Sequence, residues 1–190
     1  MARRGALLRV AALATVLGAT AAARAQGVQT RVFETEDGGK IAYTMRTHEP
    51  GVHAPKPGAV LASTSALDTM RLLSVHLSTG DIESAALLSN SPRRRYEVLR
   101  EYRDSVGAEE FKRVFAQYFD PQNRLLAEIA IGDHTLLVWE LRDDAAHQTY
   151  VAGQYFVKID DRTLIDDVPN PTRSQLRRLL QAWRDGKLER

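Results

Sequence analysis

The sequence contains no cysteine, and this absence excludes several kinds of chemistry at once. Without thiols the chain has no disulfides, no cysteine nucleophile and no thiolate ligands for a metal. No cysteine follows the apolar segment near the start of the chain, so there is no attachment point for a lipoprotein anchor. In an oxidising compartment the hydrophobic core must therefore stabilise the fold unaided.

Long hydrophobic runs are also missing, apart from one near the start of the chain. Residues 6–23 are almost all small or apolar, and Arg9 interrupts them. A helix that spans a bilayer needs about 20 consecutive apolar residues. The run is shorter than that and contains a charge, so we expect no stable membrane span.

The same segment has the layout of a signal peptide. Two arginines precede the apolar run, and Ala23 and Ala25 place small residues where a signal peptidase cleaves. We therefore expect residues 1–25 to be removed by cleavage between Ala25 and Gln26. The mature protein is then periplasmic or secreted.

Net basic charge is absent once this segment is set aside. The whole chain has 26 basic and 24 acidic residues, but four of the arginines lie in the signal segment, which contains no acid. The remaining 22 basic and 24 acidic residues give a formal charge of −2. Nucleic-acid binding requires a basic surface, so we expect no nucleic-acid partner. The remaining 165 residues suit one domain.

Turn and breaker residues divide the chain after the signal segment. Residues 26–46 predict a β-hairpin, because alternating apolar residues flank Asp37-Gly38-Gly39, which suits a tight turn. Residues 47–62 are rich in proline and glycine and predict an extended linker. Residues 63–190 then predict a single α+β domain.

Helix signals dominate the first half of that domain. Ser65 and Asp68 form a capping-box-like start, and Gly80 is a suitable stop. Pro92 sits at a first helical position, where its missing N–H is harmless. Further helices are predicted after Asp81 and from Phe111 to Tyr118, and Asn170-Pro171 predicts a last helix.

Near Asn123 the spacing of apolar residues changes from helical to alternating, which predicts four antiparallel strands. We expect a three-residue turn, Gly132–His134, that places Ile129 opposite Leu137 and Ala127 opposite Trp139. This register makes one face of the sheet wholly apolar and puts Glu128 and Glu140 on the other face.

One segment resembles a known superfamily. Leu77–Ser89, with the sequence LSTGDIESAALLS, is a helix end, a Gly-Asp step and a short helix. It resembles the opening of the ketosteroid-isomerase-like, nuclear-transport-factor-like cone fold, over roughly residues 65–168. The resemblance implies a ligand pocket in a curved four-stranded meander under N-terminal helices, with the hairpin and the C-terminal helix as additions. The superfamily includes enzymes and non-catalytic binding domains, so it implies no particular reaction.

Motifs for several reactions are missing. The chain has no Gly-x-Ser-x-Gly elbow, which an α/β-hydrolase needs to present its serine. Its five histidines include no pair four residues apart, the spacing of helical metal ligands. We expect no metal and no cofactor. Arg93–Arg95 form either an anion-binding site or, more simply, a solvated helix face.

A buried acid offers the only catalytic hypothesis. A two-residue turn at Asp161-Arg162 places Asp166 opposite Val157 and near Tyr155, where Asp166 is a candidate base and Tyr155 a hydrogen-bond donor. A three-residue turn at Asp160–Arg162 points Asp166 away. The simpler interpretation is that Asp166 ends the strand and caps a turn.

Two functional hypotheses follow. The first is an exported, non-catalytic domain that binds a small apolar ligand or an envelope protein, with Trp139, Tyr155, Phe115 and Tyr118 lining the ligand pocket. The second is an isomerase-like or dehydratase-like enzyme that uses the buried acid. A mixed outer sheet face carrying Glu128, Glu140 and Lys158 also predicts a homodimer surface.

Overall fold

The computed structural model describes residues 28–48, 62–120, 122–143 and 148–188. The predicted signal segment and most of the predicted linker lie outside these residues. Six strands are described: β1 (Gln29–Glu34), β2 (Lys40–Thr47), β3 (Arg124–Ile131), β4 (His134–Asp143), β5 (Gln148–Ile159) and β6 (Arg162–Ile165). The helices are α1 (Ala66–Thr79), α2 (Ile82–Ala86), α3 (Pro92–Val106), α4 (Ala108–Ala116) and α5 (Pro171–Arg184), with a short 3₁₀ turn, Gln117–Phe119, after α4.

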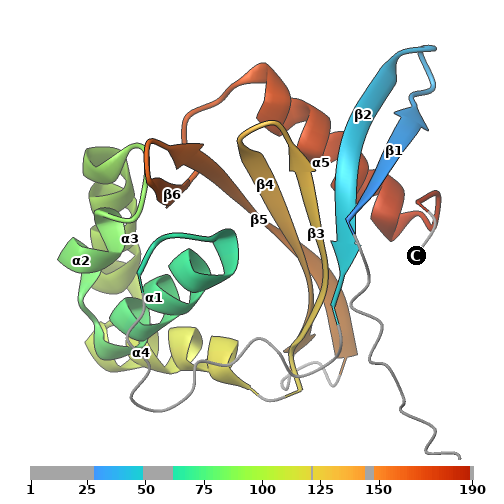
Figure 1. Ribbon diagram of the computed structural model, residues 1–190. Helices are drawn as coiled ribbons and strands as arrows, with labels where there is room; N and C mark the ends of the chain where they lie inside the picture. The colour runs from blue at the N-terminus through green and yellow to red at the C-terminus, as the bar shows by residue number, and fades with distance from the viewer. Residues whose placement is uncertain (1–27, 49–61, 121, 144–147, 189–190) are drawn as a thin grey trace, which may run out of the picture.

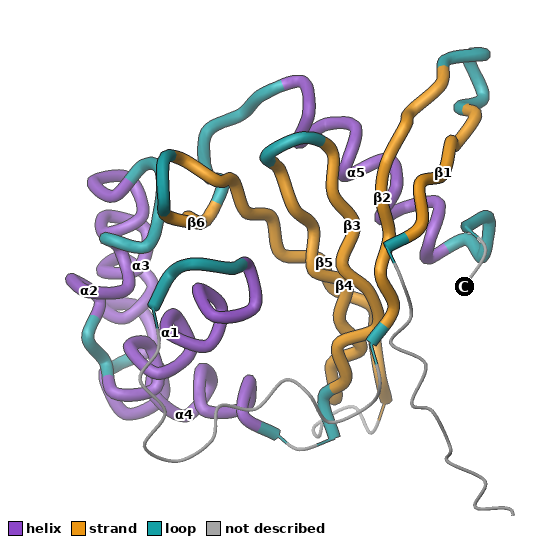
Figure 2. The backbone as a smooth tube through the Cα atoms, in the orientation of Figure 1, coloured by secondary structure: helices purple, strands orange, loops and turns teal. Residues whose placement is uncertain are grey.

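The six strands form one antiparallel sheet in chain order, from β1 to β6 (Figure 2). The predicted α+β class is confirmed, but the predicted four-stranded meander is wrong by two strands. β2 pairs with β3, with Met45 opposite Ile129, so the N-terminal hairpin extends the sheet instead of standing apart from the domain. β2 and β3 are far apart in the sequence, and the apolar pattern within each strand does not indicate which other strand it will pair with.

Helices cover both faces of the sheet (Figure 1). On one face α1 to α4 bury Leu137, Trp139 and Phe156. On the other face α5 buries Ile129, Val138 and neighbouring side chains. The sheet is therefore a middle layer between two hydrophobic cores. Among the described residues, no helix has the length and apolar character needed to cross a membrane.

The predicted helix boundaries are confirmed by their caps. The Ser65 hydroxyl accepts the Asp68 N–H at 3.1 Å, which starts α1. Gly80 ends α1 in the left-handed region at φ 83°. Asp81 accepts the Ser84 N–H at 3.0 Å to start α2. The side chain of Asn170 accepts the Arg173 N–H at 2.8 Å to start α5.

The predicted register between β3 and β4 is wrong by one residue. The turn has two residues, since Ile131 pairs with His134 and Gly132 has φ 55°, so Ile129 faces Leu136 and Ala127 faces Val138. Near the other end of β3 the register shifts between Leu125 and Ala127. This bulge turns Leu125 toward α1–α4, while the rest of β3 packs under α5.

The predicted polar outer face does not exist. Glu128 pairs with Leu137, which faces α1–α4, whereas Glu140 alternates with Trp139 and Leu141 and so lies on the opposite face. The expectation that both glutamates share a face came from the three-residue turn, and the one-residue difference in register puts them on opposite faces. Because α5 covers the second side, Val138 is fully buried there. The predicted set of Glu128, Glu140 and Lys158 therefore does not share one face, and the homodimer itself stays a prediction.

The β5–β6 turn matches neither of the two predicted alternatives. Ile159 pairs with Arg162, so the turn is Asp160-Asp161, and Asp160 has φ 52°. Val157 then pairs with Leu164, and the Asp166 N–H donates to the Tyr155 carbonyl at 2.9 Å. Asp166 is thus opposite Tyr155, and its side chain is 1% exposed.

Candidate functional site

A cavity of about 290 Å³ opens where β6 ends beside β5, between the α1–α4 layer and the start of α5. Its lining combines apolar, polar and charged side chains. The apolar lining residues come from α1, α3, α4, β5 and β6, and they are Leu73, Leu77, Leu99, Phe115, Phe156 and Ile165. Small-molecule sites usually combine apolar walls with polar groups that orient the ligand.

Aromatic packing fixes one wall of the cavity. Phe111 is fully buried in α4, and its ring centre lies 4.7 Å from that of Phe115. Tyr118 stacks on Phe115 with ring centres 6.0 Å apart. Because Phe111 anchors this row in the core, the rings of Phe115 and Tyr118 are held at the cavity in a defined position.

Three elements bring polar side chains to the cavity: the 3₁₀ turn after α4, β5 and α5. Burial raises the pKa of the Tyr118 phenol above its ordinary value of 10.0, so Tyr118 is neutral and able to donate. The side-chain oxygen of Gln154 is buried without a hydrogen-bond partner, and so is Nε of Arg173. All three residues line the cavity. Unsatisfied buried polar atoms are rare and costly, which makes these groups candidates for ligand contacts.

Asp166 also borders the cavity, but its carboxylate is already occupied. Oδ1 accepts from the Asn90 side-chain amide at 3.0 Å. Oδ2 accepts from Asn170 at 3.0 Å and lies 3.0 Å from Nδ1 of His134. These contacts join the end of β6, the start of β4 and the cap of α5. A carboxylate with both oxygens engaged is poorly placed to take a proton from a substrate.

Asp167 has a different partner. It binds Arg95 through two bonds, from Nε to Oδ2 at 2.8 Å and from Nη2 to Oδ1 at 2.7 Å. The Ser89 hydroxyl donates to the same carboxylate at 2.6 Å. This bidentate pair holds the first turn of α3 against the segment that leads into α5.

The structure brings three of the four predicted pocket residues to one cavity. Phe115, Tyr118 and Tyr155 line it, whereas Trp139 is buried in the core under α1–α4. Tyr155 and Trp139 lie on opposite faces of the sheet, since Tyr155 pairs with Leu136 and packs against the α5 core. Burial raises the pKa of Tyr155, although nearby arginines on α5 act in the opposite direction.

Sequence analysis missed the arginines of α5. Arg173 and Arg177 are four residues apart, so both lie on one side of α5, at the edge of its buried stripe. The guanidinium of Arg173 lies 5.4 Å from the centre of the Tyr155 ring. Two features of the sequence could have indicated a basic site here: the i, i+4 spacing of these arginines and the lack of an acidic residue in the first turn of α5.

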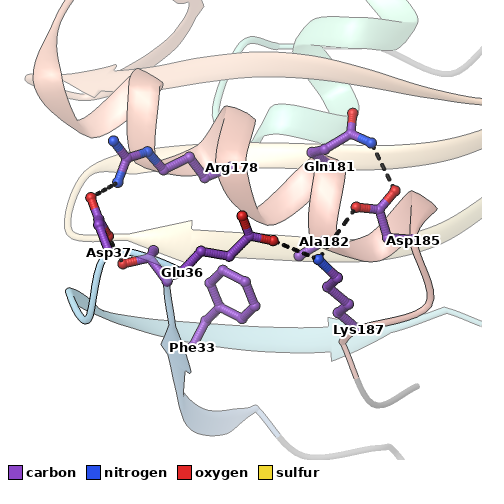
Figure 3. Close-up of a pocket in the computed structure, with 9 residues that line it drawn as sticks. Phe33, Glu36, Asp37, Arg178, Gln181, Ala182, Asp185 and Lys187 are labelled. Atoms are coloured by element: carbon purple, nitrogen blue, oxygen red, sulfur yellow. Dashed lines mark hydrogen bonds and ion pairs between the residues drawn. The ribbon is translucent and has the colours of Figure 1, made fainter.

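A second hollow lies between the β1–β2 turn and the end of α5, and it is a different kind of surface (Figure 3). Its charged groups bind one another: Lys187 lies 3.0 Å from Glu36 and 4.0 Å from Asp185, and Arg178 lies 3.6 Å from Asp37. These pairs connect the hairpin to α5. Since each of its two cations pairs with a carboxylate, this hollow offers no unpaired cation to a ligand.

No family model, curated protein or solved structure matches this chain. The resemblance to the ketosteroid-isomerase-like superfamily therefore stays a prediction from the sequence.

Proposed function

We propose that this protein is an exported, non-catalytic domain that binds a small, largely apolar molecule in the cavity beside β5. The observation that carries the proposal is a cavity of about 290 Å³ that has apolar walls and contains the unpartnered side-chain oxygen of Gln154. An apolar body would fill the space between Leu77, Leu99 and Phe115, and a donor on the ligand would satisfy Gln154.

The alternative, an isomerase-like or dehydratase-like enzyme, has less support. Its candidate base, Asp166, accepts from Asn90 and Asn170 and contacts His134. Its candidate donor, Tyr155, has its ring against the α5 core. An acid held in this way favours a structural role, because it joins three segments and leaves no oxygen open to a substrate.

Ligand capture by the exported protein tests the proposal. Native mass spectrometry of protein purified from periplasm would reveal a co-purified small molecule. In parallel, an uncharged fluorescent probe such as N-phenyl-1-naphthylamine would report binding in an apolar site. We expect saturable probe binding with one site per chain.

A substitution that fills the cavity tests whether the probe binds there. Leu77→Trp adds bulk at the cavity lining, and we expect it to weaken probe binding at least about tenfold. Gln181→Trp adds the same side chain in the hollow of Figure 3 and should leave binding unchanged. Circular dichroism would establish that both variants are folded. Equal binding by a folded Leu77→Trp variant, or no binding by the parent protein, would overturn the proposal.

A further inference from the structure

A cleft of about 250 Å³ adjoins the apolar cavity, and four arginines line it. Arg94 and Arg95 come from the first turn of α3, and Arg173 and Arg177 come from the first two turns of α5. Arg95, Asp167 and Arg173 line both the cleft and the apolar cavity. The two spaces are therefore neighbours: the cavity has the larger apolar walls, and the cleft is strongly basic.

The charge in the cleft is not balanced by the described residues around it. Asp167 is the only carboxylate among the cleft's lining residues, and it is bound by Arg95 through both of its oxygens. Among the described residues, no carboxylate forms an ion pair with Arg94, Arg173 or Arg177. The cleft therefore has four arginines and one carboxylate in its lining, and that carboxylate pairs with Arg95.

One of these groups is also partly desolvated. Nε of Arg173 is buried and has no hydrogen-bond partner. A charged donor removed from water costs free energy unless an acceptor replaces the lost hydration. A bound anion at the junction of cleft and cavity would supply that acceptor.

The positions of these arginines are unfavourable for the helices themselves. The N-terminal end of a helix carries a partial positive charge, so acidic residues stabilise the first turn and basic residues destabilise it. Both α3 and α5 lack an acid in the first turn, and each places arginine there. Together with the open cleft, this placement is consistent with recognition of an anion.

We infer that the ligand of this protein is a small amphipathic acid. Its apolar body occupies the cavity, and its carboxylate or phosphate is bound in the cleft by Arg173, with Arg94 and Arg177 beside it. This inference rests on the proposed binding function and deepens it. Asp167 holds Arg95 in place at the boundary between the two spaces.

Four probes test separately the apolar body and the acidic head group of the inferred ligand. They are octanoate, octyl phosphate, octanol and inorganic phosphate. Their affinities for the full chain would be measured by displacement of N-phenyl-1-naphthylamine and by calorimetry. We expect octanoate and octyl phosphate to bind about tenfold or more tightly than octanol, because charge-assisted hydrogen bonds add to apolar contact. Octyl phosphate should also bind more tightly than inorganic phosphate, and higher salt should weaken the anionic probes alone.

Arginine variants test the location. Arg177 is exposed and lines the cleft but not the cavity, so Arg177→Gln should weaken octanoate binding and leave octanol binding unchanged. Arg173 lines both spaces, so Arg173→Gln should weaken octanoate binding by about tenfold, and by more than it weakens octanol binding. Arg178→Gln is the matched control, because Arg178 lies on α5 but faces Asp37 in the hollow of Figure 3. It should change neither affinity.

Each contrary result overturns a different claim. If octanol binds as tightly as octanoate, or if both folded cleft variants bind octanoate normally, the acidic head group is wrong and the apolar binding function stands. If inorganic phosphate binds as tightly as octyl phosphate, the amphipathic ligand is wrong. If the parent protein binds none of the octyl probes, the proposed function itself is wrong.

Discussion

The carboxylate of Asp166 and the imidazole of His134 meet at the end of the sheet, with Oδ2 and Nδ1 3.0 Å apart. An ionised carboxylate only accepts hydrogen bonds, so Nδ1 of His134 carries the proton in this contact. Asn90 and Asn170 complete the set of partners. This buried cluster joins β4, β6, α5 and the segment before α3, and so it fixes one wall of the cavity and the cleft.

The first prediction concerns that cluster. Asp166→Asn keeps the shape of the side chain but turns an amide toward the donors of Asn90, Asn170 and His134. We expect the free energy of unfolding to fall by about 1.5–3 kcal/mol, the range for hydrogen bonds to charged groups. Urea unfolding followed by tryptophan fluorescence would measure it. Asp161→Asn, in the exposed β5–β6 turn, is the control and should stay within about 0.5 kcal/mol; equal stability of the two variants would contradict a clamping role for Asp166.

The second prediction concerns the close approach of β5 to α5. A Cβ atom at Gly153 would lie 2.5 Å from Cδ2 of Leu180 and 2.9 Å from Cδ1 of Leu136. Gly153→Ala should therefore destabilise the protein by about 1–3 kcal/mol through overpacking. In a Leu180→Ala background the same substitution should destabilise the protein less, because the Leu180 methyl groups are gone and only the contact with Leu136 remains. A double-mutant cycle measures the coupling, and strictly additive effects would show that the two side chains do not compete for space.

The third prediction concerns Glu128, whose side chain is 24% exposed. Its Oε2 lies 3.6 Å from Nε2 of His48 and 2.5 Å from Nη2 of Arg46. The His48 imidazole, followed by the Arg46 guanidinium, holds the pKa of Glu128 below its ordinary value of 4.5.

A carboxylate with a lowered pKa in the folded state stabilises the protein above the unfolded-state pKa, and this stabilisation disappears as the pH falls through the folded-state pKa. Glu128→Gln should therefore reduce stability at neutral pH by about 1 kcal/mol or less, given its partial exposure. The difference from the parent protein should vanish as the pH falls below about 4.5. Urea unfolding across that pH range checks it, with the exposed Glu97→Gln as control. A difference that persists in acid would mean that packing, and not charge, accounts for the effect.

The fourth prediction concerns the two tyrosines at the cavity. Burial raises the pKa of both Tyr118 and Tyr155 in the folded state. Stability from such a group is complete below the unfolded-state pKa of about 10 and is lost as the pH rises through the folded-state value. Ultraviolet absorbance of phenolate should therefore show late-titrating tyrosines in the folded protein, and Tyr118→Phe should remove one of them. Denatured protein is the reference. If Tyr118→Phe instead removes a tyrosine that ionises as early as those of the denatured protein, Tyr118 is not buried.

Local signals predicted the helices well because each signal acts over a single turn. Ser65, Asp81 and Asn170 cap the helices they were predicted to begin. Gly80 adopts a left-handed backbone conformation, which is higher in free energy for a residue that has a Cβ atom. The change to alternating apolar residues near Asn123 likewise marked the start of β3 correctly.

The candidate site was only partly accessible from sequence. Phe115 and Tyr118 were found because they share one helical stripe, and that stripe packs as a unit. Tyr155 and Trp139 were placed together wrongly, because the faces of β4 and β5 depend on the length of the turns between strands. Arg95 and Arg173 are far apart in the chain, and nothing local reports that they border one cleft.

The sequence by itself determined where the helices begin and end and which segments form strands, since caps, turn glycines and apolar spacing are properties of neighbouring residues. The tertiary structure alone decided the register of the hairpins, the pairing of β2 with β3 and the covering of the second sheet face by α5. The physical reason is that either face of a strand can pack against an apolar partner. Which face is buried, and against what, therefore depends on which distant helix packs there.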